Sequence, residues 1–146
     1  MARLARVILP GYSRHIIQRG NRSQDVFFCD EDYLYYLELL KEWCRQEHIE
    51  VWSYCLMTNH VHLIVCPHKH SNLSRAIGEV HRRYTRMVNF REKWRGYLWQ
   101  GRFSSFAMEE SWLLKAASYV ELNPVKAGMV TYAWEYPWSS VHAHLS

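Results

Sequence analysis

Two histidines separated by one apolar residue, His60 and His62, lie in an apolar run, 60–66, that is typical of a buried strand. Side chains alternate between the two faces of a strand, so both imidazoles should project from the same face. Such a pair can hold one metal ion and leave positions open for a substrate oxygen and a third protein ligand. Two histidines on one strand face can equally form a hydrogen-bonded polar patch, and the spacing alone does not separate these alternatives.

A second pair, Tyr119 and Asn123, is spaced four residues apart in a predicted helix, 111–123, that ends before Pro124. Residues at this spacing lie on the same side of a helix. A tyrosine can attack a phosphodiester and form a covalent phosphotyrosine, and a carboxamide oxygen can serve as a metal ligand. The pair would complete the histidine site if this helix packs against the strand that carries His60 and His62. The alternative for Tyr119 is ordinary packing at the edge of the helix.

Tyr84 is the competing nucleophile, because arginines 82, 83 and 86 surround it. It lies in the middle of an apolar helical stripe, where burial in the core is the commoner role. Its neighbour at i+4 is Val88, which cannot bind a metal. These two features favour Tyr119.

The first half of the chain predicts a strand, a helix and a hairpin. A segment that mixes Ile16 and Ile17 with polar residues and ends at Gly20-Asn21 predicts a strand over Tyr12 to Arg19. Asp30 is the expected N-cap of an amphipathic helix from Glu31 to about Glu47, with Leu34, Leu37, Leu40 and Cys44 as its apolar stripe. Two apolar runs separated by Thr58-Asn59, Ile49 to Met57 and His60 to Cys66, predict neighbouring strands with the histidine pair on an inner strand.

The second half continues the same pattern. Ser71 or Asn72 is expected to cap a helix whose stripe comprises Leu73, Ile77, Val80, Tyr84 and Met87. A fourth strand is expected within Tyr97 to Met108, followed by the helix that carries Tyr119. The predicted fold class is therefore α+β: a ferredoxin-like (RRM-like) βαββαβ antiparallel sheet with an additional C-terminal helix that carries the tyrosine.

Size and composition predict one folded domain over residues 1–146. The chain is 49% hydrophobic and 15% aromatic, which is typical of a globular protein. No apolar run approaches the roughly 20 residues that cross a bilayer, so no membrane association is expected. The four cysteines form no Cys-x-x-Cys pair and the N-terminus lacks the pattern of a secretory signal, which predicts reduced thiols in a bacterial cytoplasm.

Positive charge and aromatic rings are interleaved in the middle of the chain, which has a net charge of +4 overall. Phosphate-binding cations beside stacking surfaces suit single-stranded nucleic acid, although a solvated basic face is the alternative. The residues are Arg82, Arg83, Arg86, Arg91, Lys93, Arg95 and Arg102, with Tyr84, Trp94, Tyr97, Trp99 and Phe103.

Several motifs together resemble the HUH single-tyrosine transposases, which mobilise insertion sequences as single strands, and especially the REP-associated tyrosine transposases. The resemblance covers nearly the whole chain. Its motifs are Gln18-Arg19-Gly20-Asn21, Met57-Thr58-Asn59-His60-Val61-His62-Leu63, Arg83-Tyr84-Thr85, Leu98-Trp99-Gln100-Gly101-Arg102-Phe103, 119–128 and Trp138-Ser139-Ser140.

The resemblance implies that His60, His62 and Asn123 bind a divalent ion, Mg²⁺ or Mn²⁺, and that Tyr119 is the nucleophile. It implies a single-stranded DNA nicking and strand-transfer enzyme that acts beside a DNA hairpin and leaves a 5′-phosphotyrosine and a free 3′-hydroxyl. Candidate DNA-binding residues are Arg83, Arg86, Trp99, Arg102 and Lys126. The alternative function is a non-catalytic single-stranded nucleic-acid-binding module with the same fold.

The resemblance leaves the assembly open. Some family members are homodimers in which the tyrosine helix of one subunit completes the site of its partner, whereas REP-associated relatives can act as monomers. It also leaves open whether the enzyme moves its own element or acts on dispersed genomic hairpins.

Overall fold

The computed structural model describes residues 13–108 and 110–142, with the backbone alone for residues 110–114. Along the chain, the helices and strands follow the predicted strand-helix-strand-strand-helix-strand order and end in a helical C-terminal segment. They are β1 (Arg14–Arg19), α1 (Asp30–Gln46), β2 (Ile49–Leu56), β3 (His60–Pro67), α2 (Leu73–Glu92), β4 (Ser104–Ala107), α3 (Glu110–Glu121) and α4 (Asn123–Lys126), with short 3₁₀ helices η1 (Asn21–Ser23) and η2 (Ala133–Glu135). Tyr12, the predicted start of the first strand, lies outside the described residues.

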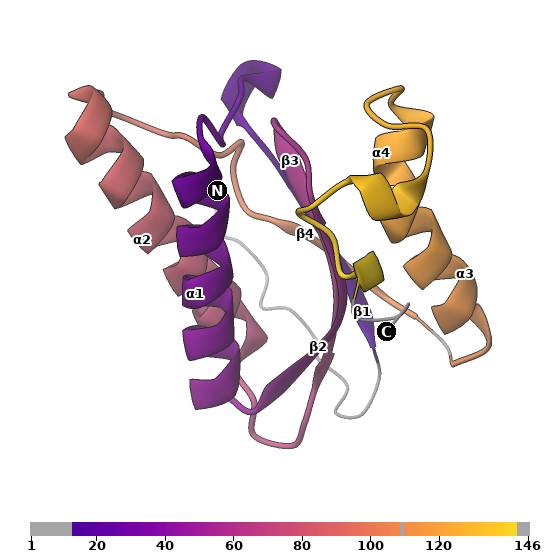
Figure 1. Ribbon diagram of the computed structural model, residues 1–146. Helices are drawn as coiled ribbons and strands as arrows, with labels where there is room; N and C mark the ends of the chain where they lie inside the picture. The colour runs from indigo at the N-terminus through magenta and orange to yellow at the C-terminus, as the bar shows by residue number, and fades with distance from the viewer. Residues whose placement is uncertain (1–12, 109, 143–146) are drawn as a thin grey trace.

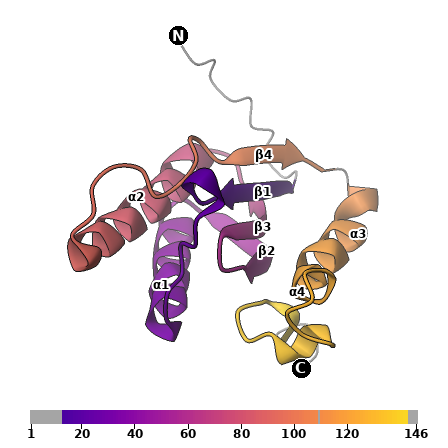
Figure 2. The ribbon, with the colours of Figure 1, turned by 90° about the horizontal axis from the view of Figure 1, so that it is seen from above.

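The four strands form one antiparallel sheet in the order β2-β3-β1-β4, which confirms the predicted ferredoxin-like α+β fold and places β3 inside the sheet. Helices α1 and α2 cover one face, and α3 and α4 lie on the other (Figure 1). Figure 2 shows the same three layers from above. The tyrosine helix is therefore separated from α1 and α2 by the sheet.

The main core fills the space between the sheet and helices α1 and α2. Alternate residues of the inner strands point into it, including Ile16, Leu63 and Val65, and Ile77 and Tyr84 come from α2. A smaller cluster of Cys55, Met57, Ile64, Val120 and Tyr136 lies on the other face, beneath α3. Hydrophobic burial on both faces of β3 explains why its sequence is an almost continuous apolar run.

The start of α1 differs from the sequence prediction. Cys29 is the N-cap and Asp30 is the first helical residue. None of the described side chains caps this helix, and Asp32 in its first turn instead accepts the N–H of Phe28 at 3.0 Å while its carboxylate pairs with Arg91 of α2. The predicted stripe is also partly wrong, because Leu34 is 52% exposed and the buried face instead uses the aromatic residues of the helix.

The other predicted helix cap is confirmed at Asn72, whose side chain accepts the N–H of Arg75 at 3.0 Å. The fourth strand is shorter than the predicted segment from Tyr97 to Met108. Gly101 adopts φ +65°, which interrupts the extended conformation, and Trp99 forms only an isolated bridge with Gly20. Within the residues that the structure describes, no helix is long and apolar enough to span a membrane.

Buried His81 predicts a loss of stability at acidic pH. Its Nε2 lies 2.9 Å from the hydroxyl of Tyr36, and burial lowers its pKa from 6.5 to about 3. Below pH 6.5 the unfolded chain binds a proton at this histidine and the folded chain does not, so the stability is complete above pH 6.5 and falls as the pH decreases toward 3. We expect His81 to contribute a loss of about 2 kcal/mol at pH 5.

Urea unfolding of the wild type and His81→Gln at neutral pH and near pH 5 measures this contribution. The glutamine keeps a hydrogen-bonding group for Tyr36 but does not titrate. We expect a smaller pH dependence in the variant, and an equal dependence in both proteins would contradict the assignment.

Candidate active site

The register of β1 against β3 gathers the ionisable residues of the site on one face of the sheet. Ile17 pairs with His62, and Arg19 pairs with His60. Because side chains alternate, His15, Ile17 and Arg19 of β1 lie on the same face as His60 and His62. This is the face on which α3 packs, so the histidine pair is directed toward the tyrosine helix and away from the main core.

Each histidine of the pair has one ring nitrogen engaged by a neighbour. The Nδ1 of His60 lies 2.7 Å from the amide oxygen of Asn59, which can only accept, so this nitrogen carries the proton. The Nδ1 of His62 lies 3.2 Å from the Nε2 of His15. With their Nδ1 atoms engaged, both rings can offer the Nε2 lone pair to an ion.

The surroundings keep these imidazoles neutral at pH 7. Burial, together with the nearby His60, His15 and Arg19, lowers the pKa of His62 to about 3. Burial and Arg19 also lower the pKa of His60, against an opposing hydrogen bond with the side chain of Asn123. Neutral imidazole is the form that binds metals, so the site is prepared for a cation without first releasing protons.

Two contacts hold α3 on the sheet. Val120 is fully buried in the smaller core cluster against β2 and β3. The adjacent Glu121 accepts hydrogen bonds from the hydroxyls of Ser53 at 3.2 Å and Ser140 at 2.7 Å, which connect the helix to β2 and to the C-terminal segment. With Val120 facing inward, Tyr119 is left at the edge of the helix that faces the histidines.

Tyr119 lies directly beside the histidine pair. Its ring centroid is 5.9 Å from that of His62 and 6.3 Å from that of His15, and 44% of the residue is exposed. The ammonium of Lys126 lies 4.6 Å from the centre of the phenol ring. The phenol is thus accessible to a large ligand and is flanked by a cation that could contact a phosphate.

Asn123 follows Tyr119 by one turn, at the junction of α3 and α4. Its side chain raises the pKa of His60, so it lies beside the first histidine of the pair. Leu122 remains in the α-region, with φ −87° and ψ −4°, and this keeps the four-residue spacing nearly helical across the junction. The structure therefore brings together the four residues 60, 62, 119 and 123 that the sequence analysis singled out.

Tyr84 is on the opposite side of the sheet and has none of these neighbours. It is fully buried in the main core, and its hydroxyl donates to the carbonyl of Val26 at 2.6 Å. Burial raises its pKa well above the usual value for a tyrosine. A buried, hydrogen-bonded phenol is not positioned to contact a DNA phosphate, which favours Tyr119 over Tyr84 as the nucleophile.

The five candidate DNA-binding residues are dispersed. Lys126 alone lies at the histidine site. Arg83 and Arg86 lie on α2, across the sheet, where Arg83 pairs with Glu79 at 3.2 Å. Trp99 is only 6% exposed and offers no stacking face to the outer surface, whereas Arg102 is exposed beside it.

His15 and Arg19 are candidate site residues that the sequence analysis missed. Both fall on the same face of β1 by strand alternation, which the sequence shows. Their partners on β3 depend on the register between two strands that are far apart in the chain, which the sequence does not show. The presence of Arg19 in the Gln18-Arg19-Gly20-Asn21 motif was the one available signal.

The combination of a ferredoxin-like sheet, a His-x-His pair on an inner strand and a tyrosine on a facing helix defines the class of HUH single-tyrosine transposases. The chain belongs to the family of IS200-like transposases, whose family model matches residues 9–123.

The relatives agree with this family. A Haemophilus influenzae protein named as a candidate REP-associated tyrosine transposase is 27% identical over 113 residues, which are 70% of this chain and 64% of the relative. A solved structure of a REP-associated tyrosine transposase bound to a REP hairpin superposes with a TM-score of 0.82 at 20% identity, covering 98% of this chain and 84% of that chain. The crystal structure of a candidate transposase from Deinococcus radiodurans R1 gives a TM-score of 0.55 at 18% identity, and the match covers 82% of this chain and 96% of that chain.

Proposed function

We propose that the protein nicks single-stranded DNA beside a hairpin and transfers the strand through a 5′-phosphotyrosine on Tyr119. The observation that carries this proposal is the position of the accessible Tyr119 phenol, 5.9 Å between ring centroids from His62 and one helical turn before Asn123. A tyrosine with a purely structural role would not require two histidines and an amide beside it.

In the proposed reaction the phenol oxygen of Tyr119 attacks the phosphorus and loses its proton. The bond between phosphorus and the 3′-oxygen breaks, and the leaving oxygen takes up a proton to become a free 3′-hydroxyl. The bond energy is kept in the phosphotyrosine, so a later attack by another 3′-hydroxyl can rejoin the strand without an energy source. Lys126 is placed to contact the anionic phosphate beside the phenol.

The donor set fits one divalent ion. His60 and His62 offer neutral imidazole nitrogens, and Asn123 beside His60 adds an amide oxygen. In the described part of the chain, no three His, Cys, Asp or Glu side chains are arranged to hold a metal. The proposed third ligand is therefore the amide oxygen of Asn123. Oxygen ligands suit Mg²⁺ and the imidazoles favour Mn²⁺. When bound, the ion would polarise a phosphate oxygen and reduce the repulsion between phenolate and phosphate.

The proposed partner is hairpin-bearing single-stranded DNA. Arg19 and Lys126 place positive charge around the histidine face, and a net charge of +4 favours an anionic partner. The related solved structure of similar fold is bound to a REP hairpin. A monomer can contain the complete site, because residues 60, 62, 119 and 123 already meet within one chain. A homodimer that exchanges α3 remains the alternative assembly.

The competing function is a non-catalytic single-stranded DNA-binding module. The observation in its favour is the exposure of aromatic residues at the sheet edge, Phe106 of β4 and Tyr97 in the preceding loop. The two functions are separated by a denaturing gel of the protein with end-labelled hairpin DNA and Mn²⁺. A covalent protein–DNA adduct supports the enzyme, and DNA binding without an adduct supports the module.

His15 is expected to orient His62 for metal binding. The Nε2 of His15 is 3.2 Å from the Nδ1 of His62. A hydrogen bond between these atoms fixes the orientation of the His62 ring and keeps its proton on Nδ1, which leaves Nε2 free for the ion. We expect His15→Phe to weaken Mn²⁺ binding by about 10- to 100-fold while the protein remains folded.

Titration calorimetry with Mn²⁺ alone, without DNA, measures this effect independently of activity. His15→Gln is the matched control, because its amide can still hydrogen-bond to His62, and we expect it to retain most of the affinity. Wild-type affinity in His15→Phe would show that His62 needs no support from β1.

A further inference from the structure

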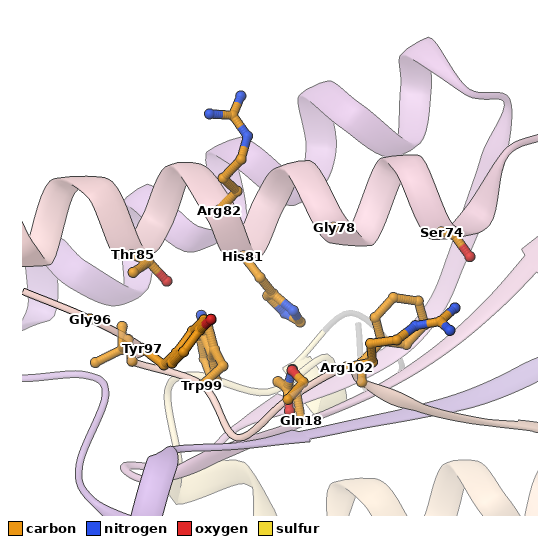
Figure 3. A pocket seen from close by; sticks show the side chains of 13 residues that line it. Gln18, Ser74, Gly78, His81, Arg82, Thr85, Gly96, Tyr97, Trp99 and Arg102 are labelled. Atoms are coloured by element: carbon orange, nitrogen blue, oxygen red, sulfur yellow. The ribbon is translucent and has the colours of Figure 1, made fainter. Parts of the chain in front are cut away.

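A cavity of about 380 Å³ lies on the face of the sheet opposite Tyr119, between α2 and the loop 96–103. Figure 3 shows its arrangement: His81 points down from α2 into the space, toward Gln18 of β1, while Tyr97, Trp99 and Arg102 rise from the loop. Its walls are mainly aromatic and apolar, with a few polar groups among them. This is the usual composition of a pocket that binds an organic ligand.

Gly78 indicates that the cavity is kept open. It lies within the 20-residue helix α2, where glycine costs about 1 kcal/mol relative to alanine. A Cβ built at Gly78 would have no atom within 4 Å, so no close packing against another element explains the missing side chain. The residue lines the cavity, and a larger side chain there would occupy it.

The walls offer surfaces for a flat heteroaromatic ring. Tyr97 is 85% exposed at the rim, and the buried Phe103 and Trp99 form part of the lining. The indole N–H of Trp99 is buried behind this lining and has no acceptor among the described residues. His81 is neutral at pH 7, because burial lowers its pKa to about 3, so the interior suits a neutral ring better than a phosphate.

Positive charge is found at the rim and not inside. Arg102 is exposed at one end of the cavity, whereas Arg82 points away from it in Figure 3 and pairs with Glu79 at 2.6 Å. A ligand with an uncharged ring and an adjacent anionic group matches this distribution of charge. A nucleotide unit of DNA has these two parts.

The loop that forms one wall of the cavity is attached to the end of β1 that also carries Arg19. The loop hydrogen-bonds to this end, with the N–H of Gln100 donating to the carbonyl of Arg19 at 2.9 Å and the N–H of Asn21 donating to that of Leu98 at 2.8 Å. Arg19 pairs with His60 across the strands. The end of β1 is therefore the shortest connection between the histidine face and the loop that forms the cavity.

We propose that this cavity receives one unpaired nucleobase of the single-stranded DNA, with Tyr97 against the ring and Arg102 on the neighbouring phosphate. The inference rests on the proposed function in so far as the ligand is single-stranded DNA. The cavity would provide a second contact with the DNA strand, through a base, on the face of the sheet opposite the proposed cleavage site.

Filling the cavity from Gly78 tests the proposal. We expect Gly78→Leu to weaken binding to single-stranded oligodeoxynucleotides of thymidine, adenosine or cytidine by about tenfold, the contribution of one stacked base. Gly78→Ala is the matched control, and it should be more thermally stable than the wild type and retain more of the affinity. Fluorescence anisotropy at a single salt concentration gives the dissociation constants, and circular dichroism checks the fold.

An abasic oligomer of the same length, which keeps the phosphates and lacks the bases, separates base binding from backbone binding. We expect wild type and Gly78→Leu to bind this probe equally well. Tyr97→Ala should lose affinity only for the base-bearing oligomers. Tyr97→Phe keeps an aromatic ring and should therefore bind them with nearly the wild-type affinity. Equal losses on both probes, or no loss on either, would overturn the proposal.

The outcome is independent of the nicking reaction. A Tyr119 adduct together with unchanged DNA affinity in Gly78→Leu would refute the base pocket and leave the proposed enzyme in place. A base-dependent loss of affinity in Gly78→Leu, without any adduct in the wild type, would support the pocket and refute the enzyme.

Discussion

Replacing Tyr119 by phenylalanine is expected to abolish the covalent protein–DNA adduct and to reduce cleavage by at least about 10³-fold. The substitution removes only the hydroxyl from a side chain that is 44% exposed, so neither the fold nor the ring contacts with His62 and His15 should change. DNA affinity should therefore remain at the wild-type level. A denaturing gel with end-labelled hairpin DNA and Mn²⁺ measures the adduct, and anisotropy measures binding.

Tyr84→Phe is the matched control for this experiment. It also removes one phenol hydroxyl, but from a buried ring that donates to the carbonyl of Val26. We expect a loss of stability of about 1–3 kcal/mol, because a buried carbonyl loses its donor, and an unchanged yield of adduct. An adduct that persists in Tyr119→Phe would show that another residue is the nucleophile.

Replacing His60 or His62 by alanine is expected to abolish metal-dependent cleavage. Each substitution removes one of the two neutral imidazoles that face Tyr119, and the remaining ligands cannot hold the ion with the same geometry. Cleavage across a series of Mn²⁺ concentrations, together with calorimetric Mn²⁺ binding, measures the loss. Added Mn²⁺ should restore little activity. An ion bound by the remaining ligands alone would not hold the phosphate in the correct position beside the phenol.

Folding has to be measured separately, because His62 is only 2% exposed and its truncation leaves a space beneath α3. Circular dichroism and thermal unfolding serve this purpose. His68→Ala is the matched control, since His68 is an exposed histidine of the same sheet region that pairs with Glu50. Metal dependence that survives intact in folded His60→Ala and His62→Ala would make the pair a structural polar patch.

Much of the fold was predictable, because local patterns are strong in this chain. The isoleucines before the Gly20-Asn21 turn, the apolar run of β3 and the cap at Asn72 each indicate an element directly. The errors fall where tertiary contacts override local preference. Asp30 does not cap α1, where Asp32 instead pairs with Arg91 of α2, and Leu34 is exposed because Tyr33, Tyr36 and Trp43 provide much of the buried face of the helix.

The residue types and spacings by themselves determined the His60–His62 pair, the Tyr119–Asn123 pair and the strand and helix on which each pair lies. These are local properties, set by periods of two and of 3.6 residues. Only the tertiary structure decided that the two pairs meet, that Tyr84 lies in the core and that His15 contacts His62. The reason is that these contacts depend on strand register and on the face of the sheet that α3 covers. Both are set by packing between segments far apart in the chain.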